Sequence, residues 1–374
     1  MRLVLEPPSM ETPMRIVSAD AVRLRIPFSD GGRGEGMTPS TWNHFDMVLV
    51  RLETDTGLVG WGEAFAYFCA DAVAAMLNET VFPLVVGRAF AEPSEITELL
   101  QRRLVLFGRY GITLFAISGV DIALWDLKGK AEDRSIAELL GGRRRQNLPA
   151  YASLVRYGEA ETAARFTRRA VSEGYGYVKL HEITRPEIEA CARELGGAAL
   201  MVDVNCSWPE DEARAMAAWL GEIGTMWLEE PTFPPEDFDQ LTRLGSPIAL
   251  SCGENLCTAW QFRDLVASGS VRYPQPSVTK VGGFTEVAKI MALAAGRDGV
   301  QIMPHSPYIG PGYLATLQIC GALETEPLFE HLYVWPDAYL YEEMPLPRGG
   351  TVHVPEGPGL GLDPSPAVIE RYRR

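Results

Sequence analysis

The feature that most constrains the fold is a regular alternation of short apolar segments with amphipathic stretches in the second half of the chain. Helical patterns lie between the apolar segments, for example at residues 159–172, 209–222 and 284–295. Strands that alternate with helices in this way form parallel sheets, and eight of them in about 180 residues predict a closed barrel. The predicted strands are residues 149–153, 177–180, 200–204, 226–228, 248–251, 271–273, 300–303 and 328–330.

The first part of the chain has a different pattern. Three alternating segments at residues 22–26, 47–52 and 58–63, with a tight turn at 55–57, predict a meander of antiparallel strands. Residues 70–131 follow with a broad helical periodicity, so we expect a separate α+β domain. The glycine-rich segment Gly31–Gly36 lies between the first two strands and suits either a lid over a site or a surface loop.

Charge and hydropathy exclude several classes of protein. The 374 residues carry 49 acidic and 34 basic side chains, a formal net charge of −15, which argues against nucleic acid or an anionic membrane as a partner. No apolar run reaches the 18 residues that a membrane-spanning helix needs. The apolar part of the N-terminus is too short for a signal peptide, and we therefore expect a cytoplasmic protein.

Cysteine and histidine patterns limit the kind of metal site. The six cysteines form no C-x-x-C pair and lie mostly in apolar stretches, so we expect buried free thiols. The five histidines show none of the close spacings of zinc hydrolases. Any metal must therefore be held by oxygen ligands.

Polar residues follow the predicted barrel strands at intervals of about 25 residues, the length of one strand and helix. Active sites of such barrels lie at the carboxyl ends of the strands, so this period places the residues in a ring around one mouth. The ring consists of Lys179, Asp203, Glu229, Glu254, Ser277, His305 and Glu330.

Three neighbouring strands each contribute one carboxylate to this ring, from Asp203, Glu229 and Glu254. Three converging carboxylates repel one another unless a cation lies between them. Ligands that are all oxygen favour Mg²⁺, which would keep water or substrate oxygens in its remaining positions. The sequence therefore predicts a magnesium site.

Three residues of the predicted barrel suggest acid/base chemistry. Lys179 and His181 lie two residues apart on one strand, so their side chains point to the same face. His305 comes from five strands further on and would face a bound substrate from the opposite side. We interpret these three as candidate catalytic residues.

Several motifs, in this order, resemble the enolase superfamily in its mandelate racemase and muconate lactonizing branch. The likeness extends over residues from about 15 to 365. The motifs are GWGEA at 60–64, GVDIALWDLKGK at 119–130, LEEP at 228–231, GEN at 253–255, KVGG at 280–283, PHSP at 304–307 and GPGLG at 357–361.

The resemblance implies a modified (β/α)₇β barrel of the TIM type with an N-terminal α+β capping domain. We accordingly expect a flexible extension at residues 1–13, the capping domain at 14–140, the barrel at 141–335 and a segment at 336–374 that returns to the capping domain. It also implies Mg²⁺ on the three carboxylates, and abstraction of the proton next to a carboxylate through an enediolate intermediate, with a Lys or His base.

Two positions depart from the family pattern. The second strand of this branch usually ends Lys-x-Lys, whereas here it ends Lys179-Leu180-His181. The position that usually holds an Asp partner of the histidine, or a catalytic Lys, is Ser277. Without a carboxylate to orient it, His305 is expected to be less basic and less fixed in tautomer.

We expect dehydration of a hydroxy acid or acid sugar to a 2-keto product, because a histidine that donates a proton needs no carboxylate partner. The alternatives are a racemase or epimerase of a 2-substituted carboxylate, and a metal-binding barrel without catalysis. The substrate is a small carboxylate, and we expect a homo-oligomer. Candidate substrate contacts are Asn205, Arg156, Tyr157, Tyr308 and Glu330.

Overall fold

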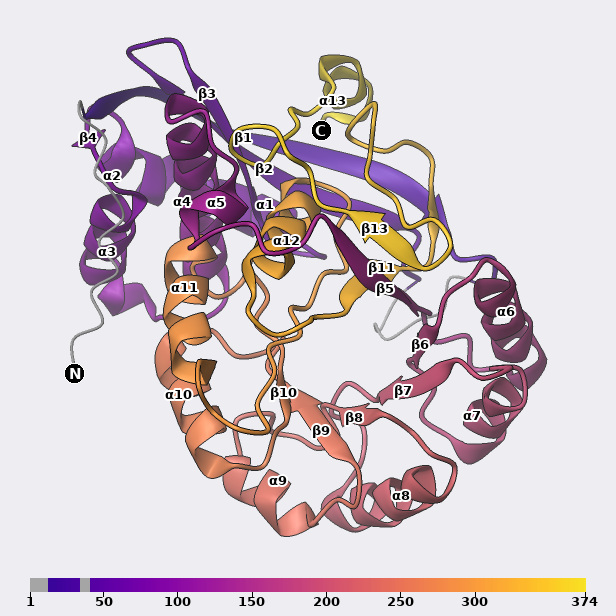
Figure 1. Cartoon of the computed structure of the whole chain (residues 1–374). Coiled ribbons are helices and arrows are strands. Elements are labelled where there is room, and N and C mark those ends of the chain that lie inside the picture. The colour runs from indigo at the N-terminus through magenta and orange to yellow at the C-terminus, as the bar shows by residue number, and fades with distance from the viewer. Residues whose placement is uncertain (1–12, 34–40) are drawn as a thin grey trace.

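The computed structural model describes residues 13–33 and 41–374. They form an N-terminal antiparallel sheet with its helices and a ring of parallel strands surrounded by further helices (Figure 1). The predicted modified (β/α)₇β barrel with an α+β capping domain is thereby confirmed. Residues 1–12 of the predicted extension and residues 34–36 of the predicted lid lie outside the described residues.

The capping sheet is the predicted meander of β1 (Met14–Ser29), β2 (His44–Thr54) and β3 (Val59–Ala64). Apolar side chains alternate along β1, and Leu24 and Ile26 are buried, which is the pattern of a strand with one face on the core. Two short strands pair with β1: β4 (Ala89–Phe90) and, from beyond the barrel, β12 (Trp335–Pro336).

Helix α4 (Ile112–Ala131) is buried along most of its length, because β3 lies against one side and the barrel helix α11 (Gly283–Ala294) against another. A Cβ atom on Gly62 would lie 2.0 Å from the carbonyl oxygen of Gly119, so this close contact requires glycine. The remaining helices of this region are α1 (Ala70–Ala75), the π-helix η1 (Met76–Val81), α2 (Phe82–Val85), α3 (Pro93–Arg103), the 3₁₀ helix η2 (Val105–Phe107) and α5 (Ile136–Leu139).

The barrel sheet has seven parallel strands in the order β10-β9-β8-β7-β6-β5-β11. They are β5 (Asn147–Ser153), β6 (Tyr177–Leu180), β7 (Ala199–Asp203), β8 (Trp227–Glu229), β9 (Ala249–Cys252), β10 (Tyr273–Pro274) and β11 (Phe329–Leu332). The other barrel helices are α6 (Ala160–Ser172), α7 (Arg185–Ala192), α8 (Glu210–Glu222), α9 (Phe238–Leu244), α10 (Ala259–Ser268) and α12 (Pro311–Ala322).

The strand predicted at residues 300–303 is wrong, because this segment donates backbone hydrogen bonds to the β10 region and, among the described residues, receives none in return. The backbone N–H groups of Gln301, Met303 and His305 donate to carbonyl groups of residues 272, 274 and 276, at 2.8, 3.0 and 3.2 Å. Pro304 and Pro307 have no N–H to donate, which limits regular pairing here. The segment nevertheless occupies the place of a strand beside β10 and delivers His305 to the mouth.

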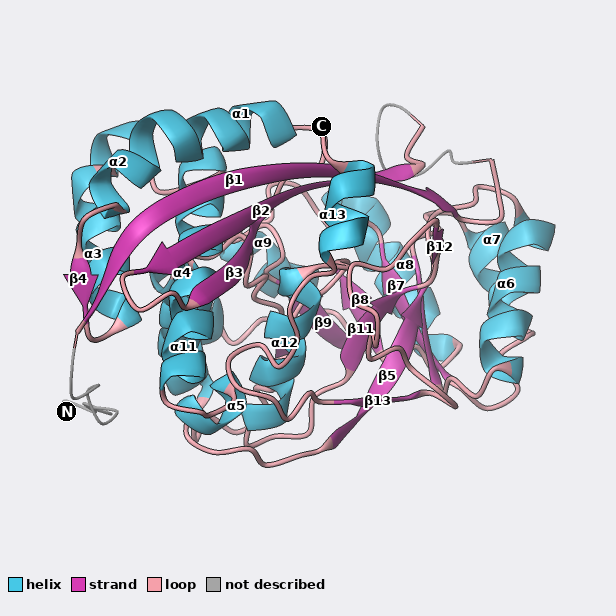
Figure 2. Cartoon of the chain, turned by 90° about the horizontal axis from the view of Figure 1, so that it is seen from above, coloured by secondary structure: helices cyan, strands magenta, loops and turns pink. Residues whose placement is uncertain are grey.

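The end of the chain crosses back over the molecule. Strand β13 (Thr351–His353) pairs antiparallel with β5, and α13 (Pro366–Tyr372) lies beside β1 (Figure 2). The backbone N–H of Arg374 donates to the carbonyl oxygen of Arg23 at 3.0 Å. The last residues thus contact both the barrel and the capping sheet.

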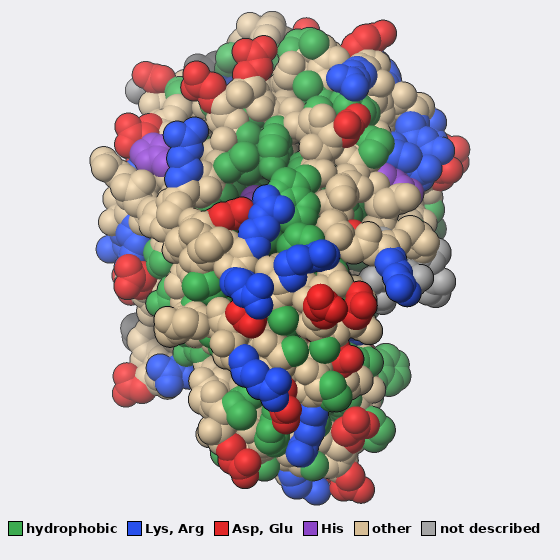
Figure 3. All heavy atoms as spheres, turned by 90° about the vertical axis from the view of Figure 1, so that its right-hand side faces the viewer, with side chains coloured by type: hydrophobic (Ala, Val, Ile, Leu, Met, Phe, Trp, Pro, Cys, Tyr) green, Lys and Arg blue, Asp and Glu red, His purple; other side chains and the backbone are tan. Residues whose placement is uncertain are grey.

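The surface carries mixed charge. On the face in Figure 3, acidic and basic side chains lie next to one another. Ion pairs between neighbouring side chains include Arg168–Glu194 at 2.7 Å and Arg214–Glu210 at 2.8 Å. All six cysteines are free, as predicted, and four of them are buried. Among the described residues, no helix combines the length and the apolar character that crossing a membrane requires.

Candidate active site

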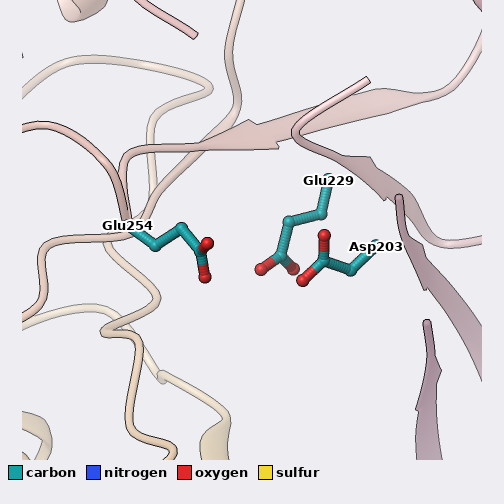
Figure 4. Close-up of side chains that lie close together, drawn as sticks. All are labelled: Asp203, Glu229 and Glu254. Atoms are coloured by element: carbon teal, nitrogen blue, oxygen red, sulfur yellow. The ribbon is translucent and has the colours of Figure 1, made fainter. Parts of the chain in front are cut away.

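Three carboxylates meet where β7, β8 and β9 end. Asp203 and Glu229 are the last residues of β7 and β8, and Glu254 follows β9. Figure 4 shows Glu254 pointing across the mouth toward the other two. One oxygen of each side chain lies within 4.8 Å of one oxygen of each of the others.

The backbone turns sharply after two of these residues. Asn205, Cys206 and Glu230 have φ angles of 45°, 60° and 44°, which non-glycine residues seldom adopt. The Glu230 carboxylate accepts hydrogen bonds from the Cys206 thiol at 3.3 Å and from the backbone N–H of Gly253 at 3.0 Å. Glu230 therefore links the loops that follow β7 and β9 and keeps the three strand ends together.

The cluster contains more acids than bases. Lys179 is fully buried, and its ammonium nitrogen lies 2.9 Å from Glu229, 2.8 Å from Glu330 and 3.5 Å from Asp203. Three carboxylates thus share one ammonium group, and the fourth, Glu254, pairs with His305 at 2.7 Å. Burial raises the pKa of Glu229 well above its ordinary value, and the neighbouring acids raise it further.

Neighbouring charged groups keep Lys179 and Glu254 ionised. Burial opposes the charge on Lys179, but Glu229 and Glu330 raise its pKa well above the ordinary value. Burial likewise opposes ionisation of Glu254, yet His305, Lys280 and Lys179 hold its pKa well below the ordinary range. The cluster thus combines ionised groups with an excess of negative charge.

These residues fit a divalent cation. Oxygen ligands at about 2.1 Å from Mg²⁺ lie about 3 to 4 Å from one another, so small side-chain rotations would bring the three carboxylates into place. The donors are all oxygen, which is the chemistry that Mg²⁺ prefers. A divalent charge would also offset the excess of carboxylates over lysine.

His181 lies on the Asp203 side of the cluster. Its Nδ1 is hydrogen-bonded to the carbonyl oxygen of Leu154, and its Nε2 lies 3.1 Å from Asp203. Because a carbonyl oxygen only accepts hydrogen bonds, Nδ1 must carry a proton. A neutral His181 therefore has its lone pair on Nε2, the nitrogen that faces the cluster.

His305 lies on the other side, beside Glu254. Its Nε2 is 2.7 Å from the Glu254 carboxylate, and its Nδ1 is 3.3 Å from the Ser277 hydroxyl. Ser277 is hydrogen-bonded in turn to the Tyr308 hydroxyl. A chain of neutral hydroxyl groups thus backs His305, and no carboxylate orients its Nδ1.

The two histidines open onto a cavity of about 450 Å³ between the barrel mouth and the capping domain. Barrel residues and capping-domain residues both line it, and all of its Phe, Tyr and Trp side chains come from the capping domain. The lining consists of Trp42, Phe65, Tyr67, Tyr110, Gly111, Phe115, Ser153, His181, Asn205, Glu254, Asn255, Cys257, Lys280, His305, Pro307, Glu330 and Leu332.

Two of the five predicted substrate contacts line this cavity, Asn205 and Glu330. The other three do not. Arg156 donates to the backbone carbonyl of His181 at 2.6 Å, and Tyr157 donates to the carbonyl of Asp30 at 3.2 Å; both line a separate cavity. Tyr308 is buried behind Ser277.

The structure adds side chains that the sequence analysis did not include among the candidate site residues. Lys280 lines the cavity, whereas Lys179 lies beneath its floor. Phe65 and Tyr67 enter from the loop after β3, and Phe115 from α4. Their only sequence signal is their position near the edge of the predicted meander, because no period connects the capping domain with the barrel.

Comparison with known proteins supports the resemblance to the enolase superfamily that the sequence motifs indicate. The family model described as "Mandelate racemase / muconate lactonizing enzyme, N-terminal domain" matches residues 18–141, and "Enolase C-terminal domain-like" matches residues 161–368. D-galactarolactone cycloisomerase of Agrobacterium fabrum is 30% identical, with 87% of this chain and 91% of that protein covered.

Other relatives span a similar share of the chain. Arabinonate dehydratase of Saccharolobus solfataricus is 30% identical, with 88% of this chain and 91% of that protein covered. The solved structure of a racemase from Streptomyces coelicolor with bound magnesium has a TM-score of 0.86 and 27% identity, covering 96% of this chain and all of that one. This chain therefore belongs to the enolase superfamily, in its mandelate racemase and muconate lactonizing branch.

Proposed function

We propose that this chain is a Mg²⁺-dependent carbon–oxygen lyase that removes water from a hydroxy acid or acid sugar and releases a 2-keto acid. The observation that carries the proposal is the position of His181 and His305 on opposite sides of the three-carboxylate cluster. Dehydration needs one group to take a proton and another to deliver one, and two imidazoles suit these tasks. Relatives named arabinonate dehydratase and D-xylonate dehydratase, each 30% identical, support this reaction class.

We assign Asp203, Glu229 and Glu254 as the metal ligands. When bound there, Mg²⁺ would withdraw negative charge from the substrate carboxylate and so acidify the neighbouring C–H group. Lys179 keeps Glu229 and Glu330 in place through its two short ion pairs and does not line the cavity. Asn205 and Glu330 line the cavity and are the proposed contacts to the substrate.

His181 is the proposed base. The Leu154 carbonyl keeps a proton on Nδ1, so a neutral His181 has its lone pair on Nε2, which lies 3.1 Å from Asp203 at the edge of the cavity, and there it would take the α-proton of a substrate bound at the cluster. The backbone bond then remains in place while the imidazole becomes charged. No rearrangement of the ring is needed during the step.

His305 is the proposed acid. As an imidazolium it donates from Nδ1 to Ser277 and delivers its Nε2 proton to the leaving β-hydroxyl. The Cα–H and Cβ–O bonds break, a Cα=Cβ double bond forms and water leaves. The resulting enol takes up one solvent proton at Cβ to give the 2-keto-3-deoxy acid.

A racemase or epimerase is the second candidate, because histidines on opposite faces could also remove and return a proton at one carbon. The similar solved structure of a racemase from Streptomyces coelicolor supports this alternative. Ser277 disfavours it, since a neutral partner makes His305 a weaker base than a carboxylate partner would. The product separates the two reactions: a 2-keto acid or a stereoisomer.

Asparagine variants of the two histidines test the roles. With an acid-sugar panel and Mg²⁺ in D₂O, His305→Asn should lose water elimination yet still exchange the α-proton, whereas His181→Asn should lose both. His353→Asn, at an exposed position on β13, is the control and should behave like the unmodified protein. If His181→Asn retains exchange and His305→Asn loses it, the two roles are reversed.

A further inference from the structure

A group of exposed apolar side chains lies where the capping domain meets the barrel helices. Val105, Leu106 and Phe107 of η2 are 58, 88 and 61% exposed, and Trp260 at the start of α10 is 58% exposed. Val105 and Trp260 line one groove of about 670 Å³. Soluble chains rarely leave contiguous apolar surface uncovered, so we expect this region to contact another molecule.

Helix α3 leads into η2 and carries unpaired charges on its outer face. Glu98 and Arg102 line the same groove as Val105, and Arg103 lines a neighbouring hollow together with them. Among the described residues, Glu98, Arg102 and Arg103 have no partner for a side-chain ion pair or hydrogen bond. Figure 1 shows α3 at the outer edge of the capping domain, where a partner can reach it.

The same pattern of charges on another helix forms an ion pair within the chain. Four-residue spacing on a helix allows an acidic and a basic side chain to meet. Glu189 and Arg193 on α7 have this spacing and pair at 3.4 Å. Glu98 and Arg102 have the same order and spacing on α3 but do not pair with each other, so both are free to pair with charges outside this chain.

The order of the charges along α3 suits a second copy of the same helix. Acidic Glu95 and Glu98 lie in its first half, and basic Arg102 and Arg103 lie at its end. A twofold axis near Leu99 places two copies of α3 antiparallel, so the acidic half of each copy opposes the basic half of the other. Such an interface is self-complementary, and one surface is enough to build it.

We propose that α3, together with Val105–Phe107 and Trp260, forms the contact between two copies of this chain in a twofold homodimer. The charges on α3 set the orientation of the two copies, and the apolar side chains of η2 and α10 leave water when the copies meet. The proposal is independent of the proposed function, because none of these residues lines the active-site cavity.

The test reverses charges on α3 and measures assembly by sedimentation velocity over a series of concentrations. The unmodified protein should sediment as a dimer or a multiple of dimers. Glu98→Arg and Arg102→Glu should each weaken the dimer by ~10-fold or more, because each places like charges together at two symmetry-related positions. An equal mixture of these two variants should restore dimers, because every opposing pair in the mixed dimer then joins opposite charges.

Glu189→Arg and Arg193→Glu on α7 are the controls and should assemble like the unmodified protein. Leu106→Ser removes apolar contact without a change of charge and should also weaken the dimer. The proposal is overturned if the unmodified protein sediments as a single chain, which would leave the surface to a different partner. It is also overturned if the α3 variants keep the same dimer, or if mixing them restores nothing.

Discussion

At the scale of single residues, the two histidines differ in what holds them. The Nδ1 of His181 is bonded to a backbone carbonyl, which accepts only, so one tautomer is selected. The Nδ1 of His305 faces the Ser277 hydroxyl, which can donate or accept and which continues to Tyr308. This asymmetry suits a fixed base on one side and a proton donor on the other.

Removal of the Ser277 hydroxyl should therefore slow the elimination of water more than the exchange of the α-proton. Ser277→Ala leaves the His305 ring without its partner at Nδ1, and we expect water elimination to slow by about 10-fold or more while α-proton exchange changes much less. The two rates are measured together by NMR in D₂O. Ser306→Ala is the matched control, since the Ser306 hydroxyl is buried nearby without a hydrogen-bond partner among the described residues. Equal slowing of both rates by Ser277→Ala would contradict the assignment.

Whether the sequence predicts a site residue depends on what determines the position of that residue in the fold. The strand period brings Asp203, Glu229 and Glu254 together, because each follows a strand of one barrel. Arg156 and Tyr157 follow β5 at the same end, yet both turn to backbone groups outside the cavity. The direction of a loop side chain depends on packing that no period encodes.

At the scale of elements, β3 and α12 meet at a buried carboxylate. Glu63 of the capping domain is 4% exposed and accepts a hydrogen bond from the backbone N–H of Gly312 at 2.8 Å. Burial raises the pKa of Glu63 from 4.5 to about 7. Between these values the folded state binds more protons than the unfolded state, so stability falls as the pH rises and stays reduced above pH 7.

Replacement of Glu63 by Gln should remove this pH dependence, because the amide oxygen can still accept from Gly312 and never ionises. Relative to the unmodified protein, Glu63→Gln should gain about 3 kcal/mol of stability between pH 4.5 and pH 8. Thermal melting in excess chelator at both pH values measures the gain, with Glu79→Gln on the surface of the capping domain as the control. A melting difference that does not change with pH would refute the linkage.

Helices and strands were predicted where the sequence pattern that marks them is local. The helices predicted at 159–172 and 209–222 appear within one residue of their predicted bounds, whereas the first meander strand, predicted at 22–26, extends over Met14–Ser29. The segment at 300–303 did not form a strand, because Pro274 and Pro276 have no N–H with which to bond back to it, and a short apolar run does not reveal this. The segment nevertheless delivers His305 to the barrel mouth, because its backbone N–H groups donate to carbonyl groups of the β10 region.

At the scale of the whole molecule, an acidic chain encloses an acidic cluster. Glu229 is fully buried and faces Lys179 at 2.9 Å, and its pKa is raised by burial and by its neighbours. The excess of buried negative charge opposes folding unless a cation is bound. Metal binding and stability should therefore be coupled.

Glu229→Gln should abolish turnover and still fold, because it removes one of the repelling charges at a strand end. Mg²⁺ should raise the melting temperature of the unmodified protein and raise that of Glu229→Gln much less. Glu222→Gln, at an exposed position at the end of α8, should respond to Mg²⁺ like the unmodified protein. Full activity of the unmodified protein in excess chelator would exclude the metal-dependent reaction.

The most direct measurement follows acid sugars by NMR in D₂O with the unmodified protein and Mg²⁺. The account predicts loss of the α-proton signal and the appearance of a 2-keto-3-deoxy acid with one deuterium at C3, and neither change in excess chelator. Recovery of the starting acid with deuterium at C2 and an inverted centre would show a racemase or epimerase instead. No exchange with any acid of the panel would contradict α-proton abstraction itself.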